Sequence, residues 1–126
     1  MKRGNHNTRT TFVFLLLWIG FFQSTFVFGQ KDIEEKKIEF LLHEVETLKD
    51  AKFWRNGSSY SPKQAADHLR MKYGRVSNDV KTAKDFIDKV ASKSSQSGRM
   101  YVIEFNDGKR ITTSAFLYQR LAAWKP

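Results

Sequence analysis

The apolar residues of this chain recur at spacings that predict helices. One series, which consists of Ile38, Leu41, Leu42, Val45 and Leu48, advances by three or four positions and therefore marks one face of an α-helix. This helix is expected over about residues 33–50, with Asp32 as its N-terminal cap. A second series, over residues 83–91, predicts a helix that begins at Thr82, with Asp85 three residues later.

A third helix is expected to begin at Ser61, where several start signals coincide. Ser61 is a hydroxyl cap, Pro62 suits the first helical position, and Gln64 completes a capping box. Gly74 lies inside the apolar series that follows and permits two interpretations: a helix that ends there, or one that continues to about Val80. The longer helix is preferred, because one interior glycine costs only about 1 kcal/mol relative to alanine.

Two turn motifs predict β-hairpins. Asn56-Gly57 stands between two short runs of aromatic and hydroxyl residues and is a strong signal for a two-residue turn. The second hairpin has strands over residues 100–105 and 109–112. A three-residue loop with a left-handed Gly108 is preferred there over a two-residue turn. It places Glu104 opposite Arg110, charge against charge, and Ile103 opposite Ile111, apolar against apolar.

A closing helix completes the expected fold. It is expected to begin at Thr113 or Ser114 and to direct Leu117, Leu121 and Trp124 toward the core. Together these elements define one small α+β domain over residues 30–126, in which about four helices pack with two short hairpins.

Residues 1–29 have the pattern of a secretory signal peptide. Three basic residues precede an apolar run over residues 12–22, and Val27 and Gly29 supply the small side chains that signal peptidase reads. Cleavage after Gly29 is expected, which would place the mature protein in the periplasm or outside the cell. The alternative is an uncleaved anchor over residues 12–28. That segment is at the short end for a membrane span and contains the polar stretch Gln23-Ser24-Thr25.

Charge and cysteine content restrict the partners and the means of stabilisation. Of the 22 Lys and Arg residues, three lie in residues 1–29, which leaves 19 against 13 acidic residues and a net charge of +6. This excess favours contact with anionic envelope components such as phospholipid or lipopolysaccharide. The basic residues are scattered, however, and form no cluster that indicates nucleic acid. Because there is no cysteine, packing without disulfides has to stabilise the domain.

Candidate binding residues lie on the first turn, the third helix and a polar loop. A step of about 100° per residue places His68 on one flank of the apolar face of its helix and Arg70 on the other. The loop over residues 94–98 is rich in hydroxyls. It is interpreted either as a cradle for a phosphate, carboxylate or sugar, or as a polar connector. The candidates are therefore Arg55, Asn56, His68, Arg70, Ser94, Ser95, Ser97 and Gly98.

Catalytic and metal-binding patterns are weak. The sequence contains no Gly-x-Ser-x-Gly, Ser-x-x-Lys or His-Glu-x-x-His motif. Asp67 diverges from His68 on a helix and is badly placed to orient that histidine as a base. His43 and Glu46 lie one turn apart but lack a second pair that would complete a metal site. No catalytic residue, metal or cofactor is assigned from the sequence.

Three segments of the chain are specific when they are taken together. They are Phe53-Trp54-Arg55-Asn56-Gly57, residues 65–72, and residues 82–92 with the loop 94–98 and Tyr101. In combination they resemble the YfeK-like family, small exported bacterial proteins that carry only a label of unknown function. The similarity covers about residues 38–102, with Arg99-Met100 where Lys-Pro is expected before the tyrosine. The resemblance implies a bacterial, periplasmic protein and implies no activity.

The preferred hypothesis is a non-enzymatic envelope module that binds a partner protein or an anionic envelope component. It follows from the export pattern, the positive charge and the lack of a nucleophile–base motif. One alternative is a small hydrolase or glycan-acting enzyme that uses His68 with a serine of residues 94–97. Another alternative is an inhibitor or immunity protein for a secreted enzyme, which only the size and the expected location indicate.

Overall fold

A computed structural model describes residues 22–126. Most of the expected signal peptide lies outside the described residues, including its basic residues and nearly all of its apolar run. The expected cleavage site after Gly29 lies within helix α2 (Phe22–Glu46). Among the described helices, none combines the length and the hydrophobicity that crossing a membrane requires. The second of two compact units, Ile33–Pro126, contains the sheet and the helices that follow α2.

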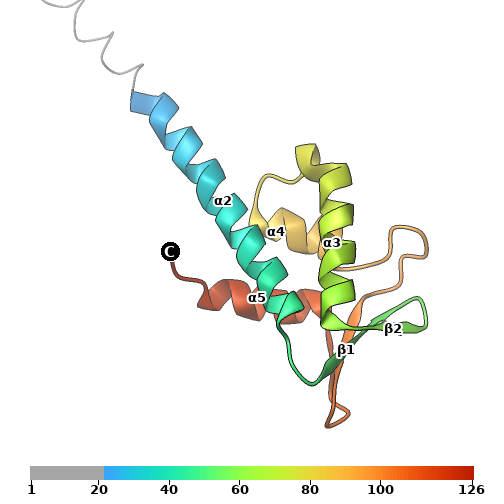
Figure 1. The fold of residues 1–126 in the computed structure, drawn as a ribbon. Helices are drawn as coiled ribbons and strands as arrows, with labels where there is room; N and C mark the ends of the chain where they lie inside the picture. Colours follow the sequence, from blue (N-terminus) through green and yellow to red (C-terminus); the bar gives the residue numbers. More distant parts are fainter. Residues whose placement is uncertain (1–21) are drawn as a thin grey trace, which may run out of the picture. The chain divides into compact units, whose positions relative to one another are not determined.

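A four-stranded antiparallel sheet unites the two predicted hairpins. Strands β1 (Ala51–Arg55) and β2 (Ser58–Tyr60) form the first hairpin, and β3 (Val102–Phe105) and β4 (Arg110–Thr112) form the second. Pairing of β1 with β3 gives the strand order β2-β1-β3-β4 (Figure 1). An isolated hairpin is at best marginally stable, so this pairing stabilises both. The prediction of an α+β domain is confirmed.

Both turn predictions are confirmed. Asn56 and Gly57 have positive φ angles of 50° and 82°, which a tight two-residue hairpin turn requires. In the second hairpin Gly108 has a φ of 84°, Glu104 pairs with Arg110, and Ile103 pairs with Ile111. The Arg110 Nε donates a hydrogen bond of 2.6 Å to Glu104, so charge complementarity does accompany this register.

Helix α3 (Pro62–Val76) begins as predicted and ends earlier. The hydroxyl of Ser61 accepts the Gln64 N–H at 3.2 Å, and the Gln64 side chain accepts the Ser61 N–H at 2.9 Å, which completes the capping box. Gly74 does not end the helix, which continues to Val76 and passes into a 3-10 turn, η1 (Ser77–Asp79). Val80 follows in an extended conformation, so it reaches the core without belonging to the helix.

Two other helix boundaries correct the predictions. Asp32 lies inside α2 and not at its start, and the helix ends at Glu46 rather than near Asp50, whose φ of 55° turns the chain into β1. The last helix, α5 (Thr113–Ala123), is capped by Thr112 instead of Thr113 or Ser114. The Thr112 hydroxyl accepts the Ala115 N–H at 3.2 Å.

The segment after Thr82 is helical, as predicted, but changes its geometry. The capping box of Thr82 and Asp85 is present and begins α4 (Ala83–Phe86), which continues as a π-helix, η2 (Ile87–Ala91). The Ser92 hydroxyl donates to the Ile87 carbonyl at 2.7 Å at the end of this segment.

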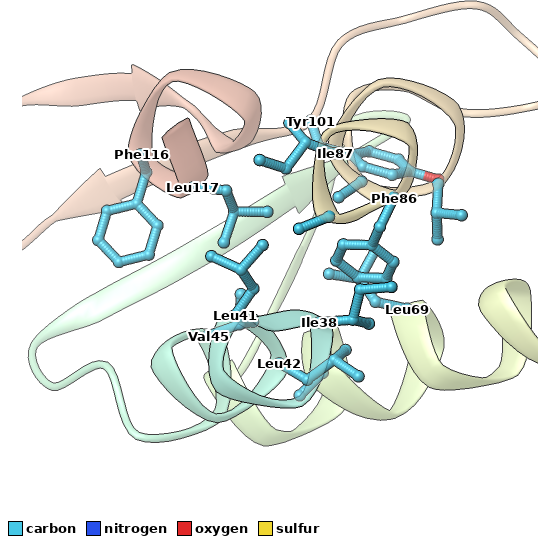
Figure 2. Close-up of a cluster of buried hydrophobic side chains, with 14 of the residues drawn as sticks. Ile38, Leu41, Leu42, Val45, Leu69, Phe86, Ile87, Tyr101, Phe116 and Leu117 are labelled. Atoms are coloured by element: carbon cyan, nitrogen blue, oxygen red, sulfur yellow. The ribbon is translucent and has the colours of Figure 1, made fainter. Parts of the chain in front are cut away.

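One apolar core connects these elements (Figure 2). Of the apolar stripe predicted for residues 33–50, Ile38, Leu41, Leu42 and Val45 lie on α2 and are buried against side chains from α3, α4, η2, α5 and the sheet. Leu48 follows the helix and is only half-buried. Leu117 of α5 is buried as predicted, while Leu121 and Trp124, which directly follows the helix, are only half-buried. Phe116, which the helical spacing did not single out, takes a core position.

Candidate ligand-binding pocket

A pocket of about 280 Å³ lies between the sheet and the first half of α3. Side chains alternate between the two faces of a strand, so Arg55 lies on the same face of β1 as the buried Phe53. This face carries the pocket. Its principal lining residues are Phe53, Arg55, Tyr60, Ala65, His68, Leu69, Tyr101 and Thr113.

Strand register brings three polar side chains into one row. Trp54 pairs with Val102, and Val102 pairs with Thr112. The next position in this register is occupied by Arg55, Tyr101 and Thr113, which therefore lie side by side on three neighbouring segments. The Thr113 N–H donates to the Tyr101 carbonyl at 2.9 Å, in agreement with this register. Since adjacent strands are about 4.8 Å apart, the backbones of Arg55 and Thr113 are separated by about 10 Å.

Arg55 and His68 meet at one end of the pocket. The Arg55 Nη1 lies 2.7 Å from Nδ1 and 2.9 Å from Nε2 of His68, and Nη2 donates to the Tyr60 hydroxyl at 3.2 Å. A guanidinium only donates hydrogen bonds, so one nitrogen of His68 has to accept, which requires the neutral imidazole. Burial lowers the pKa of His68, and the charges of Arg55, Lys72 and Arg75 lower it further.

Lys72 lies one helical turn after His68 on α3 and supports this end of the pocket. Its Nζ donates to the carbonyls of Val90 at 2.8 Å and Lys93 at 2.6 Å, and to the Tyr101 hydroxyl at 3.3 Å. These bonds use all three ammonium hydrogens and join α3 to the end of η2. Burial lowers the pKa of Lys72, and the charge of Arg55 adds to that effect.

Arg55 brings to the pocket a positive charge that no carboxylate of the described residues neutralises. Within the described part of the chain, neither Arg55 nor Lys72 forms a salt bridge with a carboxylate. Asp67 lines the pocket but pairs with Lys63 at 3.0 Å and with Arg70 at 3.5 Å. Burial raises the pKa of Tyr101, so its hydroxyl remains protonated at neutral pH. The site is therefore suited to a ligand with acceptor atoms.

Thr113 lines the pocket, and its hydroxyl is buried without a hydrogen-bond partner in the described part of the chain. The residue is 1% exposed, and its Oγ1 has no hydrogen-bond partner among the described residues. Leaving a buried polar atom unpaired costs about 1–3 kcal/mol. The oxygen is covered by the protein itself, so this cost belongs to the stability of the fold.

Asn56 joins the first turn to the polar loop. Its Nδ2 donates to the Ser94 hydroxyl at 3.2 Å, and its Oδ1 accepts from the Ser97 hydroxyl at 2.5 Å. The Ser94 hydroxyl also accepts the Ser97 N–H at 3.3 Å, and the Gly98 N–H donates to the Ser94 carbonyl at 2.9 Å. We call this set of contacts the Asn56 clasp. Ser94, at 5% exposure, is buried, whereas Asn56, Ser97 and Gly98 remain exposed.

The structure thus separates the candidate residues into three places. Arg55 and His68 lie in the pocket, whereas Asn56, Ser94, Ser97 and Gly98 belong to the clasp and Ser95 is exposed beside it. Arg70 lies in neither place and forms a salt bridge of 2.7 Å with Glu46 of α2. Sequence reasoning missed Tyr60, Lys72, Tyr101 and Thr113. For Lys72 a signal was present, because it follows His68 by four residues on one helix face.

Fold and site define a small α+β protein with a pocket that contains Arg55, and sequence comparison places it in a family. Residues 32–125 match the family described as "Family of unknown function (DUF5329)", and the chain belongs to this family. The Salmonella typhimurium (strain LT2) protein described as "Uncharacterized protein YfeK" is 44% identical over 68 residues, which cover 54% of this chain. The chain spans 57% of that relative, and the resemblance to YfeK-like proteins is confirmed. No solved structure matches this chain.

Proposed function

We propose that this protein is an exported, non-enzymatic module of the bacterial cell envelope that binds a small anion in the pocket between β1 and α3. One observation carries the proposal: Arg55 in the pocket and Lys72 behind Tyr101 have no carboxylate partner in the described structure. The envelope location is supported by the export pattern of residues 1–29 and by the positive charge of the remaining chain.

The chemistry of Arg55 supports an anionic ligand. A guanidinium has five N–H donors, and among the described residues the hydrogen bonds of Arg55 reach only the His68 ring and the Tyr60 hydroxyl. Hydrogen bonds from a guanidinium to a carboxylate or phosphate are roughly twice as strong as bonds between neutral groups. They are stronger again in a partly enclosed site, where the effective dielectric constant is lower than in water.

The hydroxyl contacts favour binding over catalysis. A serine nucleophile needs a base within hydrogen-bond reach. His68 bonds to Arg55 and Tyr101, while Ser94 and Ser97 bond to Asn56, and no hydrogen bond joins His68 to a serine of the loop among the described residues. The neutral His68 is held between a cation and a phenol, which suits a role as part of the pocket wall.

Thermal denaturation with a panel of anions at constant ionic strength tests the proposal. The panel contains inorganic phosphate, sulfate, acetate and 4-hydroxybenzoate. An anion present at ten times its dissociation constant is expected to stabilise the protein by about 1.4 kcal/mol, which raises Tm by about 6–11 °C for a domain of this size.

Two variants with equal charge loss make the test specific. Arg55→Gln is expected to abolish the rise in Tm. Lys52→Gln, which changes an exposed residue on the opposite face of β1, should retain it. No rise with any anion, or an equal rise in the Arg55 variant, would refute binding at this pocket. Cell fractionation tests the location separately, and recovery of the intact chain in the cytoplasm would contradict it.

A further inference from the structure

We infer that an anion in the pocket draws a proton onto His68, so that Arg55 and the protonated His68 hold the anion together. His68 is then a second cationic ligand, and binding of the anion is coupled to the uptake of one proton from solvent. This inference rests on the proposed function, because it concerns the same pocket and states how pH regulates it.

The contact between Arg55 and His68 requires a neutral imidazole. The Arg55 Nη1 lies 2.7 Å from Nδ1 and 2.9 Å from Nε2 of His68. In the neutral ring one of these nitrogens has a lone pair that accepts from the guanidinium, whereas the protonated ring has an N–H on both nitrogens and accepts nothing. Protonation therefore turns a hydrogen bond into a contact between two cations. An anion that accepts from both groups removes this conflict.

Cations approach His68 from β1 and from its own helix. Arg55 reaches the ring from β1, and Lys72 and Arg75 lie one and two turns further along α3. Burial of the ring lowers the pKa of His68, and these three charges lower it further. The Tyr101 hydroxyl, in the segment before β3, lies 3.3 Å from Nε2 and brings no charge. Without an anion, His68 is therefore neutral at neutral pH.

The described residues do not supply a carboxylate that balances these cations. Neither Arg55 nor Lys72 forms a salt bridge among the described residues. Asp67 lines the pocket beside His68, but it pairs with two basic residues of its own helix at 3.0 and 3.5 Å. The Tyr60 hydroxyl, from β2, accepts from Arg55 and adds no negative charge. A ligand has to bring that charge.

A bound anion and a proton on His68 favour each other. A negative charge within about 4–6 Å of a histidine stabilises the protonated ring and raises its pKa. By linkage, protonation raises the affinity for the anion by the same factor, and one pKa unit corresponds to about tenfold. Arg55 and His68 line the pocket and are both only half-buried, so an anion there can contact both. The affinity for an anion is therefore expected to rise as the pH falls.

Titration calorimetry of the full chain with sulfate at about pH 5.5 and about pH 7.5 tests the coupling. Sulfate keeps both of its negative charges over this range, so a change in affinity reports the protein, and chloride keeps the ionic strength constant. We expect sulfate to bind at least about threefold more tightly at the lower pH. Titrations between these two pH values in two buffers of different ionisation enthalpy should show that the protein takes up protons on binding.

Variants and an internal reference assign the proton to His68. His68→Gln should remove the dependence of sulfate affinity on pH, and Arg55→Gln should abolish binding at both pH values. Lys52→Gln, an exposed position on the opposite face of β1, should keep the pH dependence of the unmodified chain. In an NMR titration, saturating sulfate should raise the pKa of His68 by about one unit and leave the titration of His43, exposed on α2, unchanged. Circular dichroism checks that each variant is folded at both pH values.

The possible outcomes separate the two proposals. If sulfate does not bind, or if Arg55→Gln has no effect, anion binding in this pocket is refuted and the coupling falls with it. If binding requires Arg55 but is equal at both pH values and takes up no proton, the pocket binds anions and the coupling is wrong. Tighter binding at low pH that persists in His68→Gln would assign the proton to another group and overturn the inference. Weaker binding at low pH would also overturn it, because protonated His68 would then displace Arg55 instead of joining it.

Discussion

Replacement of Lys72 by methionine is expected to destabilise the domain by about 2 kcal/mol. Most lysine substitutions on a protein surface change stability by less than about 0.5 kcal/mol. Lys72 differs because all three of its ammonium hydrogens are bonded within the protein, two of them to backbone carbonyls. Methionine retains the apolar stem and removes only the hydrogen-bonding end.

The magnitude follows from the acceptors that would lose a donor. The carbonyls of Val90 and Lys93 accept from Lys72 at 2.8 and 2.6 Å, and each bond to a charged donor contributes about 1.5–3 kcal/mol. The bond to Tyr101 is longer, at 3.3 Å, and contributes less. Removal of a partly buried ammonium recovers its desolvation cost, which offsets part of this sum. The net loss of about 2 kcal/mol corresponds to a Tm lower by about 8–16 °C in a domain of this size.

Urea denaturation followed by tryptophan fluorescence measures the loss. The slope with denaturant should be unchanged, so that the shift of the midpoint reports stability. Lys63→Met is the matched control on the same helix, because Lys63 is exposed and its salt bridge is a surface pair with Asp67, and it should cost less than about 0.5 kcal/mol. Loss of the Lys72 charge should also raise the pKa of His68 in an NMR titration. A loss no larger than that of the control would show that water replaces Lys72 at both carbonyls.

Three further predictions concern the turn, the helix and the histidine. Asn56→Ala should lower the unfolding free energy by about 2 kcal/mol, because it removes the clasp and places alanine at a φ of 50°. Asn56→Gly removes the clasp alone and should lower the unfolding free energy by about 1 kcal/mol. A glycine variant of unchanged stability would show that the clasp contributes nothing. Gly74→Ala should raise the unfolding free energy by about 1 kcal/mol, since the added Cβ meets no atom within 4 Å apart from its chain neighbours and the backbone of α3 itself. No gain would indicate that the helix frays there. His68 binds fewer protons in the folded state than in the unfolded state, because its folded pKa is below the ordinary 6.5. Its contribution to the free energy of unfolding is therefore complete above about pH 6.5 and declines as the pH falls toward the folded pKa. His68→Gln should remove that decline in urea unfolding between pH 7 and 5, and equal pH profiles for both proteins would contradict it.

The fold could be predicted where a few neighbouring residues determine the conformation. The capping box at Ser61, the turn at Asn56-Gly57 and the charge match of Glu104 with Arg110 each depend on residues within one turn or one hairpin. The pairing of β1 with β3 was not predictable in the same way, because it joins residues as distant as Ala51 and Phe105. Helix ends also deviated where tertiary packing decides them, as for α2 before the bend at Asp50.

The site could be predicted in part for the same reason. Helical geometry placed His68 and Arg70 on opposite flanks of α3, and the structure gives Arg70 a salt bridge with Glu46 on α2. The partnership of Arg55 with His68 and the row that continues to Thr113 depend on the order of strands in the sheet. A threonine in a sequence carries no sign that its hydroxyl will be buried without a partner.

The polar loop serves the pocket without contributing a side chain to its lining. Lys72 holds the segment after η2 through the Val90 and Lys93 carbonyls, and the Asn56 clasp holds the same segment through Ser94 and Ser97. Arg55 directly precedes Asn56, so the Asn56 clasp fixes the end of β1 that carries Arg55. His68 lies one turn from Lys72, so the hydrogen bonds of Lys72 fix the part of α3 that carries His68. The Ser94 and Ser97 hydroxyls bond to Asn56 in the turn after β1, whereas Lys72 on α3 is bonded by the Val90 and Lys93 carbonyls and the Tyr101 hydroxyl. The serines beside the pocket are therefore explained by their contacts with the turn that directly follows Arg55, and neither Ser94 nor Ser97 lines the pocket.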